Sequence, residues 1–222
     1  DQYVVNDFQA DLGFVRRNDI FQIDPVATRI FYPADSKINT HTIELRGSST
    51  WGPELDFKQT DAMVDLEYQI QFRNQNSIEV ALNHRYTYLL EEFDPTGSDD
   101  GIPLPAFSDY NYTKLDFSFR SDRRKPFSFN ARTDIGQFFN GYRYALSTDF
   151  TLRLQPFFTA SIQSSVNYID LPDPYPSETI WFLGPRAEVT FSKNIFWSTF
   201  IQYNSRDEDF SINSRLQWRF KP

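Results

Sequence analysis

The stretch YRYALSTDFTLRL at residues 142–154 decides the fold, because its apolar and polar side chains alternate. One parity holds the apolar set: Tyr142, Tyr144, Leu146, Phe150, Leu152 and Leu154. The other parity holds the polar set: Arg143, Ser147, Asp149, Thr151 and Arg153. A helix would scatter both sets around its circumference, whereas a strand places them on opposite faces. The stretch is therefore predicted to be a β-strand with one apolar and one polar face.

The same period of two recurs at residues 64–73, 126–138 and 209–220, and no segment shows a convincing helical pattern. Cutting the chain at turn-forming residues gives about twelve strands, although Gly13 and Pro25 interrupt the pattern near the N-terminus. The predicted ranges are 3–16, 20–32, 39–51, 57–73, 77–92, 109–120, 126–138, 142–154, 157–170, 179–191, 195–204 and 209–220. Short turns alternate with longer loops at 94–108 and 171–178, which is typical of outer-membrane barrels with periplasmic short turns.

Alternation by itself also fits a soluble β-sandwich, so three further features decide between the two folds. The predicted strands are about 10 to 17 residues long, against the usual five or six of soluble proteins. A barrel of about twelve strands is too wide for side chains to fill, so an apolar interior would be a void. Trp51 and Trp181 are expected on the apolar face near the long-loop end, and Trp197 and Trp218 near the short-turn end, as in membrane-interface belts. The sequence therefore predicts an all-β, antiparallel transmembrane β-barrel.

Composition excludes several other classes of protein. Lys and Arg number 22 against 30 Asp and Glu, so the net charge of −8 argues against nucleic-acid binding. Cysteine is absent and histidine occurs only twice, which rules out thiolate metal sites and leaves too few ligands for a histidine-rich one. We therefore predict neither a metal site nor a cofactor.

Four segments occur in the order GFVRRNDI (13–20), GIPLPAFSDYNY (101–112), IGQFFNGYR (135–143) and FIQYNSRDEDFSINSRLQWRFKP (200–222). They resemble the C-terminal barrel region of domain-of-unknown-function family 5916 of Gram-negative bacteria. The most specific part of the resemblance is the set Gln202, Tyr203, Asn204, Asn213, Arg215, Leu216 and Trp218. The resemblance implies an outer-membrane location and a barrel that follows a module similar to family 9 carbohydrate-binding domains. That module does not occur in this sequence, so we expect residues 1–222 to form a single barrel domain or part of a larger barrel.

Charged residues on the polar parity are expected to line the lumen of the barrel. They are Glu44, Arg46, Asp65, Glu67, Arg73, Glu79, Arg85, Lys114, Asp116, Arg120, Arg132, Asp134, Arg143, Asp149, Arg153, Arg186, Glu188, Arg215 and Arg219. Acids and bases are mixed, which favours a lumen filled by salt bridges over a selective constriction carrying one sign of charge.

Two other features could carry chemistry, but the sequence gives weak support to each. The loop DPTGSDDG (94–101) offers carboxylates, yet its spacing does not fit a calcium loop, and the same residue types suit any exposed turn. His84 falls on the apolar parity, where membrane-barrel lipases hold their catalytic groups, but no serine motif accompanies it. We therefore predict no catalytic residue.

Three functions of different classes stay open at this point. The first is an outer-membrane anchor or companion subunit, linked to carbohydrate recognition through the module that the resemblance implies. The second is a channel or transporter for small solutes through the charged lumen, and the third is a lipid-modifying enzyme of the outer wall. We expect membrane lipid, lipopolysaccharide and other outer-membrane or periplasmic proteins as partners, and no nucleic acid.

Overall fold

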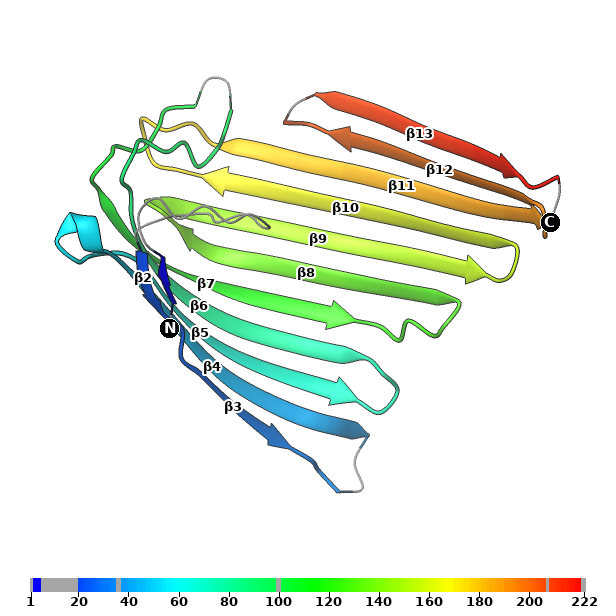
Figure 1. Cartoon of the computed structure of the whole chain (residues 1–222), viewed down its shortest axis with the longest axis horizontal. Coiled ribbons are helices and arrows are strands. Elements are labelled where there is room, and N and C mark those ends of the chain that lie inside the picture. The colour runs from blue at the N-terminus through cyan, green and yellow to red at the C-terminus, as the bar shows by residue number, and fades with distance from the viewer. Residues whose placement is uncertain (1, 5–19, 35–36, 99–100, 207, 221–222) are drawn as a thin grey trace.

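A computed structural model of the chain describes residues 2–4, 20–34, 37–98, 101–206 and 208–220, which form one antiparallel sheet (Figure 1). The first strands are β1 (Gln2–Val4), β2 (Ile20–Ile23), β3 (Val26–Phe31), β4 (Ile38–Gly52), β5 (Lys58–Phe72) and β6 (Ser77–Tyr88). They are followed by β7 (Asp109–Arg120), β8 (Phe127–Phe138), β9 (Gly141–Leu154), β10 (Phe158–Asp170), β11 (Glu178–Ser192), β12 (Ile195–Asn204) and β13 (Asp209–Trp218). A 3₁₀ turn, Pro53–Leu55, is the one helical element in the described part of the chain.

From β4 onward, each strand pairs with the next one along the chain, so the sheet is a simple meander. The observed strands match the predicted ranges within two residues, except that β6 ends at Tyr88 and not at residue 92. The predicted strand 20–32 is broken at Asp24 and Pro25 into β2 and β3, which both pair with β4. Proline has no N–H to donate, and its carbonyl instead accepts the Gly47 N–H at 2.9 Å. Most of the predicted strand 3–16 lies outside the described residues.

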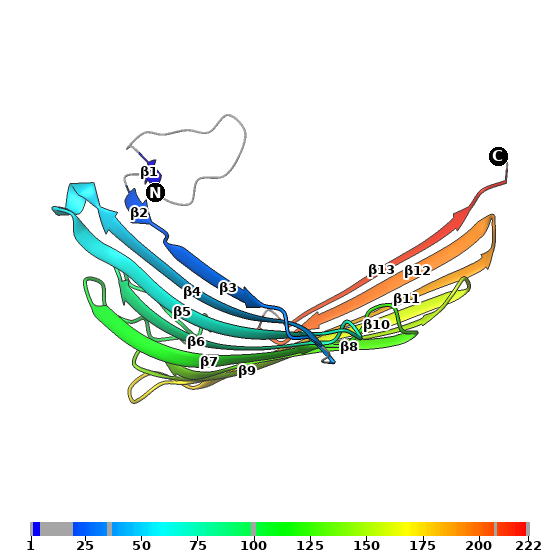
Figure 2. The same ribbon diagram turned by 90° about the horizontal axis from the view of Figure 1, so that it is seen from below.

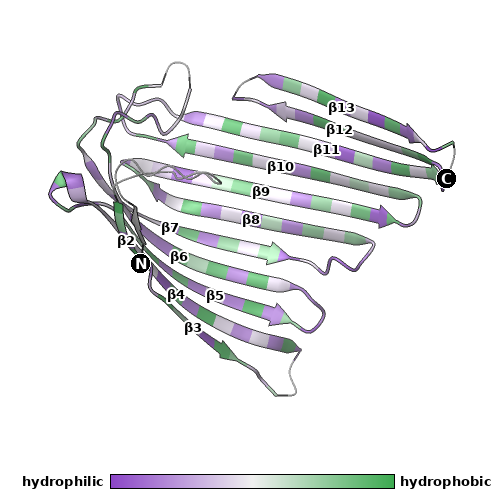
Figure 3. Ribbon diagram, in the orientation of Figure 1, coloured by the Kyte–Doolittle hydropathy of each residue, from purple (hydrophilic) through white to green (hydrophobic). Residues whose placement is uncertain are grey.

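The sheet is curved into a trough (Figure 2). Polar and apolar residues alternate along the strands, as Figure 3 shows. Leu82 is 48% exposed while its neighbour Asn83 is 5% exposed, and Leu115 at 49% adjoins Asp116 at 7%. Side chains converge on the concave side of a curved sheet and splay apart on the convex side. The concave face is therefore the polar one, and the convex face presents apolar side chains outward, the reverse of a soluble half-buried sheet.

The sheet is open among the described residues. β13 pairs only with β12, and β1 and β3 lie at the opposite edge of the sheet, so these edges do not meet. The all-β, antiparallel prediction is thus confirmed, while a closed barrel is not seen. No helix in the described ranges has the length and apolar character needed to cross a membrane.

The connections at the two ends of the strands differ in length. We call the end where β6, β8, β10 and β12 finish the loop end, and the opposite one the turn end. The longest described connections, 89–108 and 171–177, are both at the loop end. The turn end carries the short connections 73–76, 121–126, 155–157 and 193–194.

Candidate functional site

The charged residues predicted to line a lumen share the concave face of the sheet. Strand register aligns Arg46, Asp65, Asn83 and Lys114 across β4 to β7, so these side chains point the same way. Every other member within a strand has the same parity, and Arg73 and Arg219 lie one residue beyond the ends of β5 and β13. The concave face is thus the candidate site, although its role as a lumen stays a prediction.

The centre of this face is a network of ion pairs built around Lys114. Its Nζ donates to Asp134 Oδ2 at 2.9 Å and lies 3.4 Å from Asp116 Oδ1. Arg132 lies 3.6 Å from Asp116, and Arg143 lies 3.8 Å from Asp134. Strand β7 supplies Lys114 and Asp116, β8 supplies Arg132 and Asp134, and β9 supplies Arg143. The acidic and basic side chains therefore neutralise one another locally.

The carboxylate oxygens in and beside this network are unevenly hydrogen-bonded. Asp116 Oδ2 accepts the Asn83 Nδ2 amide at 2.8 Å. The buried Oδ1 atoms of Asp65, Asp116 and Asp134, however, accept no hydrogen bond from the described residues. The cationic side chains nearby therefore stabilise these oxygens by charge alone. A hollow of about 240 Å³ lies over the region, but no group of three or more metal-ligating side chains occurs within the described ranges.

Residues 89–98 and 101–108, between β6 and β7, fold against the polar face at the loop end. Phe93 and Leu104 exchange backbone hydrogen bonds of 3.1 and 2.8 Å, and Leu104 is fully buried. Tyr112 of β7 and Phe139 complete an aromatic cluster with Phe93, with ring centroids 5.3 to 5.4 Å apart. The loop therefore forms a small apolar core on a face that is otherwise polar. The prediction that β6 continues to residue 92 is wrong because these residues belong to the folded loop.

Arg206, in the connection between β12 and β13, holds this loop in place. Its Nε donates to the Gly97 carbonyl at 3.1 Å, and its Nη2 donates to the Thr96 carbonyl at 2.9 Å. The contact joins segments 110 residues apart in sequence and spans the ends of the intervening strands. Sequence reasoning missed Arg206, because it lies in a loop and belongs to neither face of the sheet.

Charge is segregated between the two ends of the strands. At the loop end, connections and terminal strand positions hold Glu54, Asp56, Glu91, Glu92, Asp94, Asp109, Asp170, Asp173, Glu178, Glu208 and Asp209, and their only described cations are Lys58 and Arg206. At the turn end, the corresponding positions hold Lys37, Arg73, Arg120, Arg123, Arg124, Lys125, Lys193 and Arg219, with Asp122 as the only described anion. The turn end therefore attracts anions and the loop end repels them. The runs SDRRKP (121–126) and DPTGSDDG (94–101) already carry this signal in the sequence.

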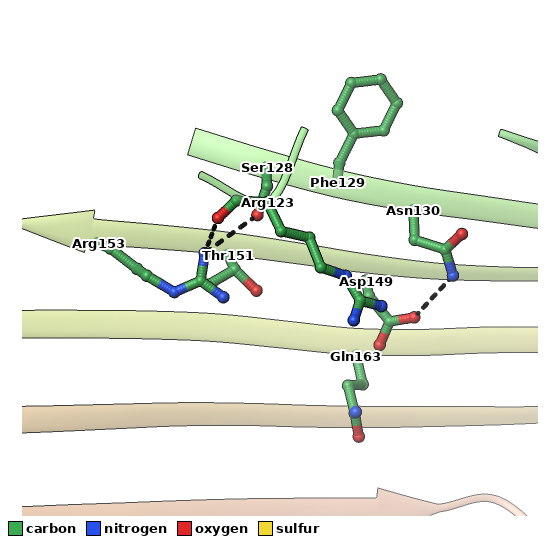
Figure 4. Close-up of a pocket in the computed structure, with 8 residues that line it drawn as sticks. All are labelled: Arg123, Ser128, Phe129, Asn130, Asp149, Thr151, Arg153 and Gln163. Atoms are coloured by element: carbon green, nitrogen blue, oxygen red, sulfur yellow. Dashed lines mark hydrogen bonds between the residues drawn. The ribbon is translucent and has the colours of Figure 1, made fainter. Parts of the chain in front are cut away.

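A hollow of about 320 Å³ lies on the polar face near the turn end (Figure 4). Arg153 Nη1 donates to the Arg123 carbonyl at 3.0 Å, and Asn130 Nδ2 donates to Asp149 Oδ2 at 3.3 Å. The side chain of Arg123 also lines this hollow, although it was not among the predicted residues. Arg123 was missed because it lies in a turn, where strand parity gives no assignment.

The four tryptophans lie on the convex face, two at each end of the strands. Trp181 pairs with Val166 near the loop end, and Trp218 pairs with Ile195 near the turn end. Trp197 shares the turn end, and Trp51 packs on Phe21 at the loop end with ring centroids 5.7 Å apart. Their assignment to a membrane interface stays a prediction.

Both histidines lie on the convex face. His84 Nδ1 is 2.8 Å from Thr113 Oγ1, and His41 Nδ1 is 2.6 Å from the Tyr68 hydroxyl. In a catalytic triad, a hydrogen bond to the second ring nitrogen orients the histidine. Among the described residues, none forms such a bond with His84. In the candidate calcium loop, Asp94 Oδ1 accepts from the Thr96 N–H and hydroxyl, while Asp99 and Asp100 lie outside the described residues.

Comparison of the chain with protein-family models, with curated proteins and with solved structures found no match.

Proposed function

We propose that the chain forms the wall of a transmembrane β-barrel in the bacterial outer membrane, with its concave polar face toward the lumen. The observation that carries the proposal is the inverted polarity of the sheet. Exposed apolar side chains occur on strand after strand of the convex face, and Leu66, Leu146 and Val166, for example, are 47 to 49% exposed. Water-soluble monomers rarely expose apolar patches larger than a few hundred Å². Lipid would cover this face, and salt-bridged polar side chains would fill the interior.

Strand length and side-chain distribution also support membrane insertion. Strands β7 to β10 contain 12 to 14 residues, and a tilted membrane-spanning strand needs about 9–11. Leu66, Leu82 and Leu115 lie near the middle of the convex face, whereas aromatic side chains lie toward its ends. Tyr142 and Trp181 are near the loop end, and Phe157 and Trp218 are near the turn end. This arrangement matches an apolar band between two aromatic girdles.

Within this architecture we propose a role as a membrane anchor or companion subunit. The polar face carries a cross-linked network of mixed sign, and the loop 89–108 packs against it at one end. A selective pore would instead favour a ring of one charge sign. The family resemblance adds a link with carbohydrate recognition through an attached module. Because open strand edges are not tolerated in hydrocarbon, the proposal also requires further strands, of this or another chain, to close the barrel.

Three measurements on the full-length protein test this proposal. Brominated phospholipids should quench tryptophan fluorescence, most strongly when the bromine lies near the headgroups. Absence of quenching would refute membrane insertion. In planar bilayers we expect no steady conductance. During purification we expect a partner protein to remain bound. A steady conductance whose ion selectivity shifts in Arg143→Glu or Arg215→Glu would refute the anchor role and support a channel.

Orientation follows from the loop lengths, since short turns are periplasmic in bacterial barrels. Cysteine introduced at Glu91 is therefore expected to react with a membrane-impermeant reagent on intact cells. Cysteine introduced at Gln75 should react only after the outer membrane is opened. The opposite labelling pattern would show that the proposed orientation is reversed.

A further inference from the structure

The turn between β7 and β8, residues 121–126, is held by several hydrogen bonds. Asp122 accepts from Arg124 through its backbone N–H at 2.9 Å and its guanidinium at 3.0 Å. The Asp122 N–H donates to Asn76 Oδ1 at 2.9 Å, which ties this turn to the neighbouring one. Arg153 adds a bond of 3.0 Å to the Arg123 carbonyl. The backbone of the turn is thus fixed before any ligand arrives.

Two cationic side chains on this fixed turn have no anionic partner among the described residues. Arg124 is neutralised by Asp122, whereas the side chains of Arg123 and Lys125 form no hydrogen bond or ion pair with the described residues. Both line a hollow of about 580 Å³, and Arg153 forms part of the same wall. Arg123 and Arg153 also border the polar-face hollow of Figure 4, so they lie at the rim between the two hollows. Cations held on a rigid backbone lose little conformational entropy on binding an anion, apart from that of their own side chains.

The other side of this hollow is apolar. Leu154, which also lines it, is 53% exposed and belongs to the convex face. Phe127, which follows Pro126 of the hollow, is 54% exposed, and Phe157, two residues beyond Gln155 of the hollow, is 65% exposed. The hollow therefore lies where the apolar convex face meets the basic turn end. It presents positive charge and hydrocarbon-compatible surface next to each other.

We propose that this hollow binds the phosphodiester headgroup of an anionic phospholipid, with Arg123 and Lys125 contacting the phosphate and Leu154 contacting the first acyl carbons. The proposal rests on the membrane location proposed above. It accounts for the pairing of free cations with exposed apolar side chains, which a soluble phosphate would not need. The basic turn end as a whole would concentrate anionic lipid in that leaflet.

The test uses full-length protein in nanodiscs of phosphatidylcholine containing a minor fraction of phosphatidylglycerol, with retained lipid counted by native mass spectrometry. Phosphatidylglycerol should be enriched on the protein. Each cation near an anionic surface contributes about fivefold to affinity, so the double variant Arg123→Gln, Lys125→Gln should bind phosphatidylglycerol about thirtyfold more weakly. The exchange variant Arg123→Lys, Lys125→Arg keeps both charges and should stay within about threefold of wild type.

The matched control is the double variant Lys37→Gln, Lys193→Gln, which removes equal charge at the same end but outside the hollow. It should lose less than about threefold, and an equal loss in both double variants would overturn the site in favour of a diffuse field. Displacement of the lipid by inorganic phosphate at a comparable concentration would overturn the lipid assignment in favour of a soluble anion. Tryptophan quenching in the same nanodiscs separates the two proposals. Insertion without lipid preference refutes only the lipid site, and no insertion refutes the membrane location itself.

Discussion

Replacing Lys114 with methionine is expected to lower the free energy of unfolding by about 2 kcal/mol, because Lys114 separates two like charges. Asp116 and Asp134 are direct cross-strand partners on β7 and β8, an arrangement that is unfavourable for two carboxylates. Lys114 Nζ lies 2.9 Å from Asp134 Oδ2 and 3.4 Å from Asp116 Oδ1. Without it, both carboxylates stay in a partly desolvated site and repel each other.

The magnitude follows from the remaining groups. Removing one partner of a buried ion pair costs about 3–5 kcal/mol. The Lys114 side chain is 20% exposed, and Arg132 and Arg143 remain within 3.8 Å of the two carboxylates, so we take a lower value of about 2 kcal/mol. Adding Asp134→Asn to Lys114→Met removes the repulsion and should restore about 1 kcal/mol.

The assay is reversible urea unfolding in phospholipid vesicles, followed by tryptophan fluorescence. The control is Arg186→Met, which removes the 2.7 Å ion pair with Glu188. The side chain of Arg186 is 56% exposed and that of Glu188 is 31% exposed. That substitution should cost less than about 1 kcal/mol, because solvent already screens the pair. If Lys114→Met costs no more than Arg186→Met, the polar face is fully hydrated. Salt-bridged side chains would then not fill the interior.

Three further changes test other parts of the fold. Arg206→Ala removes two hydrogen bonds to the loop 89–108 and should raise the hydrogen-exchange rate of the loop amides about tenfold. An unchanged rate would show that contacts within the loop are enough to keep it folded. Gly136→Ala places a methyl group 2.5 Å from the β7 backbone at φ +156° and should cost about 2 kcal/mol or more in urea unfolding, so a neutral result would contradict the tight strand contact. Hydrogen bonds from the Arg124 side chain and backbone lower the pKa of Asp122 below 3.8, so its contribution to stability is present above that value and is lost as pH falls through the lowered pKa. Asp122→Asn should therefore be less stable than wild type at neutral pH and equal to it in strong acid, and a difference that persists in strong acid would refute the cause.

The sequence pattern predicted the strands and their faces because a strand has a period of two and antiparallel partners share a face. It placed Asp65, Lys114 and Asp134 on one side of the sheet, and the register does the same. The pattern could not identify their partners, since each ion pair depends on which strands are adjacent and how they are shifted. The folded loop 89–108 and its contact with Arg206 were also out of reach, because no local periodicity encodes them.

The two edges of the sheet indicate where further strands would join. At the β3 edge, Pro25 and the break at Asp24 interrupt pairing, and Arg29 has the parity of the apolar face. Proline, charge and irregularity are the usual means of blocking an exposed strand edge. Strand β13 has no proline and no bulge over residues 209–218, and its charged residues, Asp209 and Arg215, have the parity of the polar face. Its alternation continues unbroken, with Ile212 and Leu216 about two-thirds exposed. The β13 edge is therefore shaped for another strand, and we expect the closing partner of the proposed barrel to pair there first.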